Sequence, residues 1–407
     1  MADTYPINAV TTAVAQEDRF TPANVEVNDI FTLTVTGDDG VTNAVNFTAT
    51  ATTVANVTAG LTAAWNASTH RLCTPITATD MTTYMKLVAD TAGRSFSVAA
   101  TTTDGGGNNN QTLTKTSQTA SAGPEDWGLA GNWFTNAVPV DSDNVVIDAR
   151  ATDDLIYSMN QSAVDLTKLD VYMSYVNQLG DTTFPLRISA TTCQIGLPVG
   201  DGSSPSGPTF VNLAFGSVNN TTKVYNSRKT GINGLLPINL KGSHSANVLH
   251  VFGGVVGVAT ARPGDTATYV TVKVDGGKCV LSSGVTTSTV TQVGGELVQG
   301  CACTTLTQDA GMLETNGSGA ITTATINGTA YLESSGTITT LEIRTSGNVD
   351  MTGSKVARTV TTLQMHKGST LAYDPAVVTI TNPIQLLDCT IEDVTIKVPP
   401  GRTVVVA

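Results

Sequence analysis

The second half of the chain repeats one short pattern of hydrophobic and polar positions. Each copy has a Thr-rich stretch, a turn that contains Gly, and then a short apolar stretch. The first apolar positions of five successive copies lie 16, 18, 17 and 22 residues apart, at Val290, Leu306, Ala324, Leu341 and Leu363. Helical repeats need about 33 residues or more per unit, whereas one coil of a β-solenoid needs about 20. We therefore predict stacked, regular β-coils over residues 276–407.

Strand-like runs separated by turns also occupy residues 145–275, but their spacing is longer and less regular. We expect irregular coils here, with a Gly- and Ser-rich loop at residues 198–208. Cys279 lies two residues after a Gly, in the position that Leu297 and Leu313 fill in later copies. This position predicts a thiol buried in the core of its coil.

Residues 1–118 show a different pattern, which predicts a small α+β domain. Apolar and polar residues alternate over residues 31–35 and 45–49, on either side of an Asp-Asp-Gly turn, as they do in a β-hairpin. A helix is predicted next, because Thr52 or Thr53 can act as its N-cap. Its apolar residues follow helical spacing at Val54, Val57, Leu61 and Trp65.

Two further strand regions, around residues 76–89 and 96–98, complete the expected order ββαββ. The stretch 101–123 contains little that is apolar, so we expect a flexible turn or linker. Residues 119–144 are predicted to be a linker and a cap. In this segment Trp127 and Trp133 can close the open end of the solenoid, whose apolar interior would otherwise meet water.

Composition narrows the classes of function. Charged residues make up only 13% of the chain, about half of the usual ~25%, and Thr, Ser and Asn take their place. The net charge of −12 and the pI near 4.7 argue against binding to nucleic acid or to an acidic membrane surface. The sequence contains no apolar run of about 18 residues, and its start lacks the features of a secretory signal.

Candidate chemistry is sparse in this sequence. His244 and His250 are six residues apart, and we expect turn and surface positions for them rather than a metal pair. Cys301 and Cys303 flank Ala302, so a strand would point both thiols to one face, where we expect packing. No nucleophile, zinc or phosphate-loop motif is present. We therefore predict no catalytic, cofactor-binding or metal-binding residues and no enzyme activity.

Acidic residues are the alternative to that prediction, since a polysaccharide hydrolase needs two carboxyl groups facing one cleft. In the regular coils, acidic residues spaced about one coil apart are Glu296, Glu314, Glu333, Glu342 and Asp350. Around the start of the first coils the candidates are Asp141, Asp143, Asp148, Asp153 and Asp154. The run Asp141-Ser142-Asp143-Asn144 could hold Ca²⁺, and an Asx turn explains it equally well.

Two segments carry a resemblance to known families. Residues 31–93, with a hairpin, a helix that reads Val54-Ala55-Asn56-Val57, and a strand closed by a Gly turn, resemble a small module of phage tail and sheath-like proteins and the hook-type insert of flagellar proteins. The segment Trp127 to Ile147 resembles the entry to β-helical regions in large surface adhesins. The resemblance implies structural units on the surface of an assembly, with no catalytic residues.

These observations together predict a mainly β protein, with a small N-terminal α+β (ββαββ) module followed by a right-handed parallel β-helix. We expect a virion structural protein of a bacteriophage, as a capsid decoration protein or head spike. Its expected partners are the major capsid protein or tail proteins and two further copies in a homotrimer. The alternative is a tail fibre, tailspike or adhesin that binds host surface glycans, with a depolymerase as one form of it.

Overall fold

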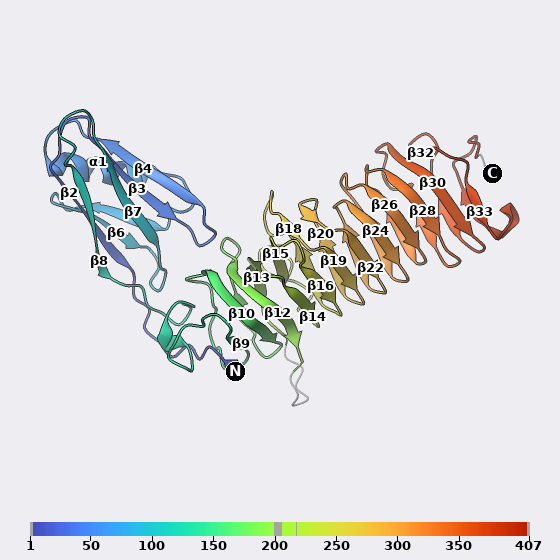
Figure 1. Ribbon diagram of the computed structural model, residues 1–407, viewed down its shortest axis with the longest axis horizontal. Helices are drawn as coiled ribbons and strands as arrows, with labels where there is room; N and C mark the ends of the chain where they lie inside the picture. The colour runs from blue at the N-terminus through green and yellow to red at the C-terminus, as the bar shows by residue number, and fades with distance from the viewer. Residues whose placement is uncertain (1–2, 199–205, 217, 405–407) are drawn as a thin grey trace.

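The computed structural model describes residues 3–198, 206–216 and 218–404 and is elongated (Figure 1). An N-terminal domain forms one end, and a stack of parallel strands runs to the C-terminus at the other end. The beginning of the chain lies between the two, beside the first strands of the stack. Most of the predicted loop 198–208 falls outside the described residues.

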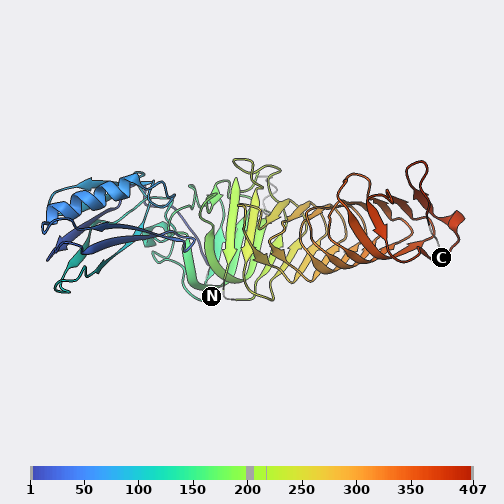
Figure 2. The same cartoon turned by 90° about the horizontal axis from the view of Figure 1, so that it is seen from above.

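The N-terminal domain consists of two antiparallel sheets and one helix. The sheets have the strand orders β5-β6-β2-β8 and β4-β3-β7. Figure 2 shows α1 lying along one side of these strands. The bounds of its elements are β2 Glu17–Ala23, β3 Ile30–Thr36, β4 Thr42–Thr48, α1 Val54–Ala67, β5 Ile76–Asp80, β6 Met85–Ala89, β7 Ser97–Thr103 and β8 Thr112–Thr119.

The predicted hairpin and helix lie where the sequence pattern places them. Strands β3 and β4 pair with Phe31 opposite Phe47, so that the alternating apolar side chains of β3 point into the core. Thr53 caps α1 by accepting a hydrogen bond from the Asn56 N–H. The helix buries Val57, Leu61 and Trp65, and the Trp65 indole donates to the Ile76 carbonyl at 2.9 Å.

The predicted order ββαββ is wrong because it omits β2 and β8, and the stretch 101–123 is not a flexible linker. It contains the end of β7 and all of β8, which pairs antiparallel with β2. The sequence pattern does not reveal strand β2, because Asp18, Arg19 and Pro22 interrupt the alternation of apolar and polar residues. The pattern does not reveal strand β8 either, because only Leu113 is buried. Two polar faces are common in a strand at the edge of a sheet.

The remaining strands form coils with two main parallel ladders. The first ladder has β9 Asn144–Ile147, β10 Asn160–Tyr172, β12 Leu186–Leu197, β14 Thr221–Val224, β16 Val248–Val251, β19 Thr271–Val274, β22 Thr289–Gln292, β24 Cys303–Gln308, β26 Ile321–Ile326, β28 Ile338–Ile343, β30 Arg358–His366, β32 Val378–Ile380 and β33 Gln385–Leu387. The second has β11 Gln178–Leu179, β13 Phe210–Phe215, β15 Ile238–Gly242, β17 Val255–Val258, β20 Lys278–Leu281, β23 Glu296–Gln299, β25 Met312–Thr315, β27 Thr329–Leu332, β29 Asn348–Asp350, β31 Thr370–Ala372 and β34 Thr395–Lys397.

Four further short elements lie outside these two ladders. Strands β18 Ala267–Thr268 and β21 Val285–Thr286 pair with each other at a third side of their coils. Two 3-10 helices cover Ala130–Asn132 and Ile391–Asp393. The long strand β12 bends between ladders, because its beginning pairs with β13 and its end with β14.

The predicted stacking of coils is confirmed by the register of the first ladder. The five repeat positions from Val290 to Leu363 are direct neighbours in successive coils. We call such a row of neighbours, one from each coil, a file. The same buried file continues back to the first strand of the stack as Val145, Leu169, Cys193, Thr222, Leu249 and Val272. The predicted core position of Cys279 is also confirmed, because it lies in register with Leu297 in the second ladder.

Two glutamines interrupt an otherwise apolar inner file. Gln292 and Gln308 are fully buried and lie in register between Val274 and Ile326. Each side chain spans the turn between ladders. The Gln292 amide donates to the carbonyls of Gly295 and Met312 at 3.0 and 2.8 Å, so a polar side chain tightens the turn while it satisfies buried carbonyls.

The N-terminal end of the solenoid is covered by aromatic side chains and by the beginning of the chain. Trp127 and Trp133 are fully buried and meet edge to face, with ring centroids 4.7 Å apart. The Trp133 indole donates to the Trp127 carbonyl at 2.8 Å. Strand β1, Asp3–Thr4, pairs with β9, so the first coil has a protein neighbour on its outer edge rather than water.

Candidate functional site

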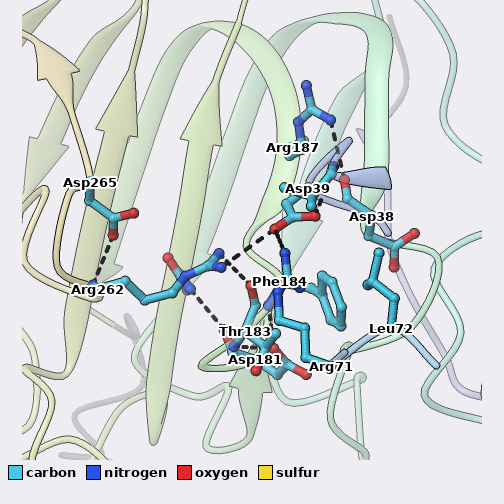
Figure 3. A network of polar contacts seen from close by, with 12 residues as sticks. Asp38, Asp39, Arg71, Leu72, Asp181, Thr183, Phe184, Arg187, Arg262 and Asp265 are labelled. Carbon is cyan, nitrogen blue, oxygen red and sulfur yellow. Dashed lines mark hydrogen bonds and ion pairs between the residues drawn. The ribbon is translucent and has the colours of Figure 1, made fainter. Parts of the chain in front are cut away.

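The N-terminal domain is fastened to the solenoid through the turn between β3 and β4 (Figure 3). The Asp39 carboxylate in this turn accepts from Arg71 of its own domain at 2.6 Å. It also accepts from Arg262 of the solenoid at 3.4 Å. The Asp39 side chain is only 11% exposed, compared with 35% and 29% for the two arginines. One carboxylate therefore joins two cations from different parts of the chain.

The neighbouring residue, Asp38, makes a second set of contacts across the joint. Its carboxylate accepts from the Met159 N–H at 3.0 Å, and its carbonyl accepts from Arg187 at 3.3 Å. Arg262 also donates to the Thr183 carbonyl. We call this set of contacts around Asp38 and Asp39 the latch.

A cavity of about 240 Å³ lies beside the latch, between the N-terminal domain and the first coils. Its wall comes from both parts, with residues 35–38, 72, 75–76 and 94–97 on one side and 156–158, 160–161, 181 and 184 on the other. Three aromatic rings and four polar side chains define its character. They are Phe96, Tyr157, Phe184, Asp38, Arg94, Gln161 and Asp181.

The electrostatics of this cavity are dominated by partly buried carboxyl groups. Burial raises the pKa of Asp38 above its usual value, and the charges of Asp126 and Asp181 add to the rise, although the Met159 N–H and Arg94 oppose it. Burial likewise raises the pKa of Asp181, against the hydrogen bonds from the Phe184 and Thr183 N–H groups. The cavity therefore carries two carboxyl groups with raised pKa values and the guanidinium of Arg94.

Asp39 behaves in the opposite way. Burial alone would raise the pKa of its carboxyl group, but the Val41 N–H and the charges of Arg71 and Arg262 lower it below the usual value. The latch and the cavity thus place two adjacent aspartates in opposite electrostatic environments. Asp39 is paired in the latch, and Asp38 faces the cavity.

Tyr157 and Arg94 of the cavity wall are partly buried, so their polar ends remain accessible to water. Neither the Tyr157 hydroxyl nor the Arg94 guanidinium makes a hydrogen bond or an ion pair there. Arg94 lies 5.9 Å from the centroid of the Phe184 ring. Because unpaired polar groups in a concave, half-apolar site favour a polar ligand, this cavity is the candidate functional site.

The acidic residues singled out from the sequence lie elsewhere, and most serve turns. Asp143 accepts from the Val140 N–H at 2.9 Å and Asp141 from the Asp165 N–H at 2.9 Å. Asp148 pairs with Arg150 at 2.6 Å. The Asp153 carboxylate accepts from Thr152, and that of Asp154 from the Gln178 N–H and side chain. Within residues 3–198, 206–216 and 218–404, no three His, Cys, Asp or Glu side chains are placed to hold a metal ion.

The acidic residues of the regular coils do not form one continuous row of neighbours. Glu296 pairs with Lys278 at 2.5 Å and has Met312 as its neighbour in the next coil. Glu314 lies between Val298 and Tyr331. Asp350 follows Tyr331 in the same row of the second ladder. Glu342 pairs with Arg344 and His366 on the first ladder, and Glu333 lies directly after β27. The coils thus separate these carboxylates by other side chains.

The histidines and cysteines also lie apart from the cavity. His250 on β16 pairs with Asp275 at 2.6 Å, while His244 lies in the preceding turn and accepts from the Ala246 N–H. Cys301 and Cys303 are buried free thiols, and the Gln299 amide donates to the Cys303 sulfur at 3.0 Å. Burial raises the pKa of Cys301 to about 12, as expected for a packed thiol.

Sequence reasoning missed the cavity residues. Asp38 and Asp39 were assigned only to a hairpin turn, and Arg94, Tyr157 and Asp181 were not singled out. The one signal in the sequence is that two acidic residues stand side by side at the tip of this turn.

Comparisons of the chain with known protein families, with curated proteins and with solved structures give no match. In the described part of the chain, no helix is long and apolar enough to cross a membrane.

Proposed function

We propose that this chain is a structural protein of a bacteriophage particle, in the role of a capsid decoration protein or a head spike. The observation that carries the proposal is the unbroken core file from Val145 to Leu363, in which every coil is hydrogen-bonded to the next. A stack of this kind keeps its length and direction, because bending would break ladder hydrogen bonds and open the core. These properties suit a part that projects from a shell.

The N-terminal domain is the part that we propose to dock on the particle. It is of the kind that resembles a module of phage tail and sheath-like proteins, and the latch fixes its direction relative to the solenoid. A docked domain would therefore set the angle at which the rod projects. We take the winding of the coils to be right-handed, as parallel crossover connections almost always are.

The outer surface of the regular coils supports a position on a particle exposed to solvent. The outward positions of the first ladder are occupied by hydroxyl side chains in successive coils, at Thr271, Thr289, Thr305, Thr323, Thr340 and Thr362. Threonine suits strand geometry and presents a hydroxyl to water without adding charge. Threonine on this face accounts for the low content of charged residues. The face can therefore stay exposed to water and need not be covered by another protein.

We further propose that three copies associate along one flank of the solenoid. Met312 and Tyr331 lie on successive strands of the second ladder, and Val293 lies one coil earlier in the turn that leads into that ladder. The side chains of Val293, Met312 and Tyr331 are 40%, 38% and 40% exposed. We call these three residues the apolar flank. Association would remove their apolar surface from water, at roughly 25 cal/mol per Å², and homo-oligomers of this kind form closed rings about a symmetry axis.

A tail fibre or host-binding adhesin is the second candidate. The observation that favours it is the half-polar cavity at the joint, because a purely mechanical rod needs no such recess. Under this alternative the rod would serve as a spacer, and the cavity would contact a host surface glycan.

The proposed function is tested on particles released from cells that carry the gene. Antibodies against the chain are used for immunogold electron microscopy, and particle fractions from a density gradient are analysed for the chain and the major capsid protein. Gold over particle heads, with the two proteins in one fraction, is the expected result. Gold confined to tails supports the second candidate, whereas a chain found only outside the particle fractions contradicts both.

A further inference from the structure

We propose that the cavity between the N-terminal domain and the solenoid binds a single neutral sugar unit. This inference goes beyond a structural role in the particle and concerns only the cavity beside the latch. Its basis is the size of the cavity, the mixture of rings and polar groups in its wall, and the absence of a hydrogen bond or an ion pair from two of those groups in the described ranges.

The size of the cavity limits the ligand. Its volume of about 240 Å³ lies just below the range of about 300–1,000 Å³ for drug-sized ligands. One pyranose ring fits such a volume, whereas a lipid chain or a nucleotide does not. The cavity is also open to solvent on one side, so a sugar at the end of a longer glycan can enter.

The polar wall selects among small ligands. An apolar ligand would strip water from Asp38, Arg94 and Asp181 without replacing its hydrogen bonds, which is costly. An anion would meet the carboxylates of Asp38 and Asp181 against a single guanidinium. A neutral ligand that both donates and accepts hydrogen bonds satisfies all three groups at once.

A sugar supplies these bonds in the required directions. Its hydroxyl groups donate to the carboxylates of Asp38 and Asp181 and accept from the guanidinium of Arg94 in charge-assisted hydrogen bonds. The Tyr157 hydroxyl can donate or accept. The C–H faces of a pyranose are apolar, and they pack against aromatic rings such as those of Phe96 and Phe184.

The wall also requires the two parts of the chain to stay together. Asp38 and Arg94 come from the N-terminal domain, and Tyr157 and Asp181 come from the first coils. Asp38 and Asp181 are each held in place by backbone N–H groups, from Met159 in one case and from Thr183 and Phe184 in the other. A bound sugar would bridge both parts and so stabilise the latch.

The inference is tested by binding measurements on the full chain. Saturation-transfer NMR and calorimetry are carried out with free glucose, galactose, mannose and N-acetylglucosamine, each up to about 20 mM. A ligand of about twelve heavy atoms at ~0.3 kcal/mol per atom gives a Kd on the order of 1 mM. We expect at least one of these sugars to bind with one site per chain.

Two cavity variants and one matched control locate the site. Arg94→Gln should lower the affinity about tenfold, because a charge-assisted hydrogen bond is lost. Tyr157→Phe keeps the shape of the ring and should lower it about threefold. Arg19→Gln makes the same change at an arginine that pairs with Glu17 outside the cavity, and it should leave the affinity unchanged.

The outcomes separate clearly. Saturable sugar binding that is weakened by both cavity variants and not by the control supports the inference. No binding at about 20 mM, binding that ignores both variants, or binding of phosphate or methylamine in place of every sugar overturns it. None of these binding results depends on whether the chain is part of a particle. The immunogold test of the proposed function is therefore independent of this test.

Discussion

The latch gives the sharpest prediction, through the substitution Asp39→Asn. The change keeps the size of the side chain and removes the charge that joins Arg71 to Arg262. The N–H of Arg262 at Nε and the Arg71 Nη1 group have no partner within the described ranges even in the native chain. The substitution therefore leaves two partly buried cations with fewer contacts at the joint.

The size of the effect follows from the burial of the three groups. Breaking a fully buried pair by removing one partner costs about 3–5 kcal/mol, and exposed pairs contribute about 0–1 kcal/mol. Asp39 is 11% exposed, whereas both arginines are about one third exposed. We therefore expect the latch to lose about 1–3 kcal/mol.

The assay is amide hydrogen exchange followed by mass spectrometry. Local opening of the joint by this amount should speed exchange about five- to 150-fold in peptides around residues 37–41 and 181–187. Peptides of the regular coils, such as 321–343, should be unchanged. Asp309→Asn is the matched control, because Asp309 is exposed and makes no side-chain contact in the described part of the chain. Equal exchange at the joint in the two variants would refute the latch.

Three further predictions concern the pH, the core and the flank. The pKa of Asp39 is lowered in the folded chain, so its stabilisation is present above the usual value near 3.8 and is lost as the pH falls through the folded value. After correction for the intrinsic pH dependence of amide exchange, protection at the joint should fall more steeply at acid pH in the native chain than in Asp39→Asn, in which Asp38 and Asp181 still titrate. Leu306→Ala should lower the free energy of unfolding by about 2–5 kcal/mol in urea denaturation, because Leu306 is fully buried next to Ala324, while the outward Thr305→Ser should cost less than about 0.5 kcal/mol. Met312→Lys should convert the proposed trimer to monomers in light scattering, and a native chain that is already monomeric would remove the flank from the account.

The solenoid could be predicted from the sequence because stacking forces the same chemistry into the same position of every coil. Val290, Leu306 and Leu341 recur at nearly constant spacing for that reason. The register also placed Cys279 in the core. Regularity of this kind is local, since each coil touches only its neighbours.

Strands β2 and β8 of the N-terminal domain could not be predicted in this way. Strand β8 buries a single apolar residue, Leu113, and β2 begins with three charged residues, of which Asp18 is buried. Asp18 is one of these residues, and it is tolerated because Lys115 of β8 pairs with it at 3.0 Å. The pattern of each strand is readable only when its partner is known.

The candidate site could not be predicted from the sequence for a related reason. Its residues come from turns and strand ends that have no periodic pattern. Asp39 and Arg262 are 223 residues apart in the chain, and Asp38 and Met159 are 121 apart. Contacts of such long range depend on how the N-terminal domain packs against the first coils. No local sequence pattern predicts that packing.

Electron cryo-microscopy of particles from cells with and without the gene is the most direct test of the proposed role. Particles from cells with the gene should carry slender rods at fixed positions on the head, each with the N-terminal domain at the shell and the coils pointing outward. Particles from cells without the gene should lack these rods. Identical particle surfaces in the two preparations would contradict the account.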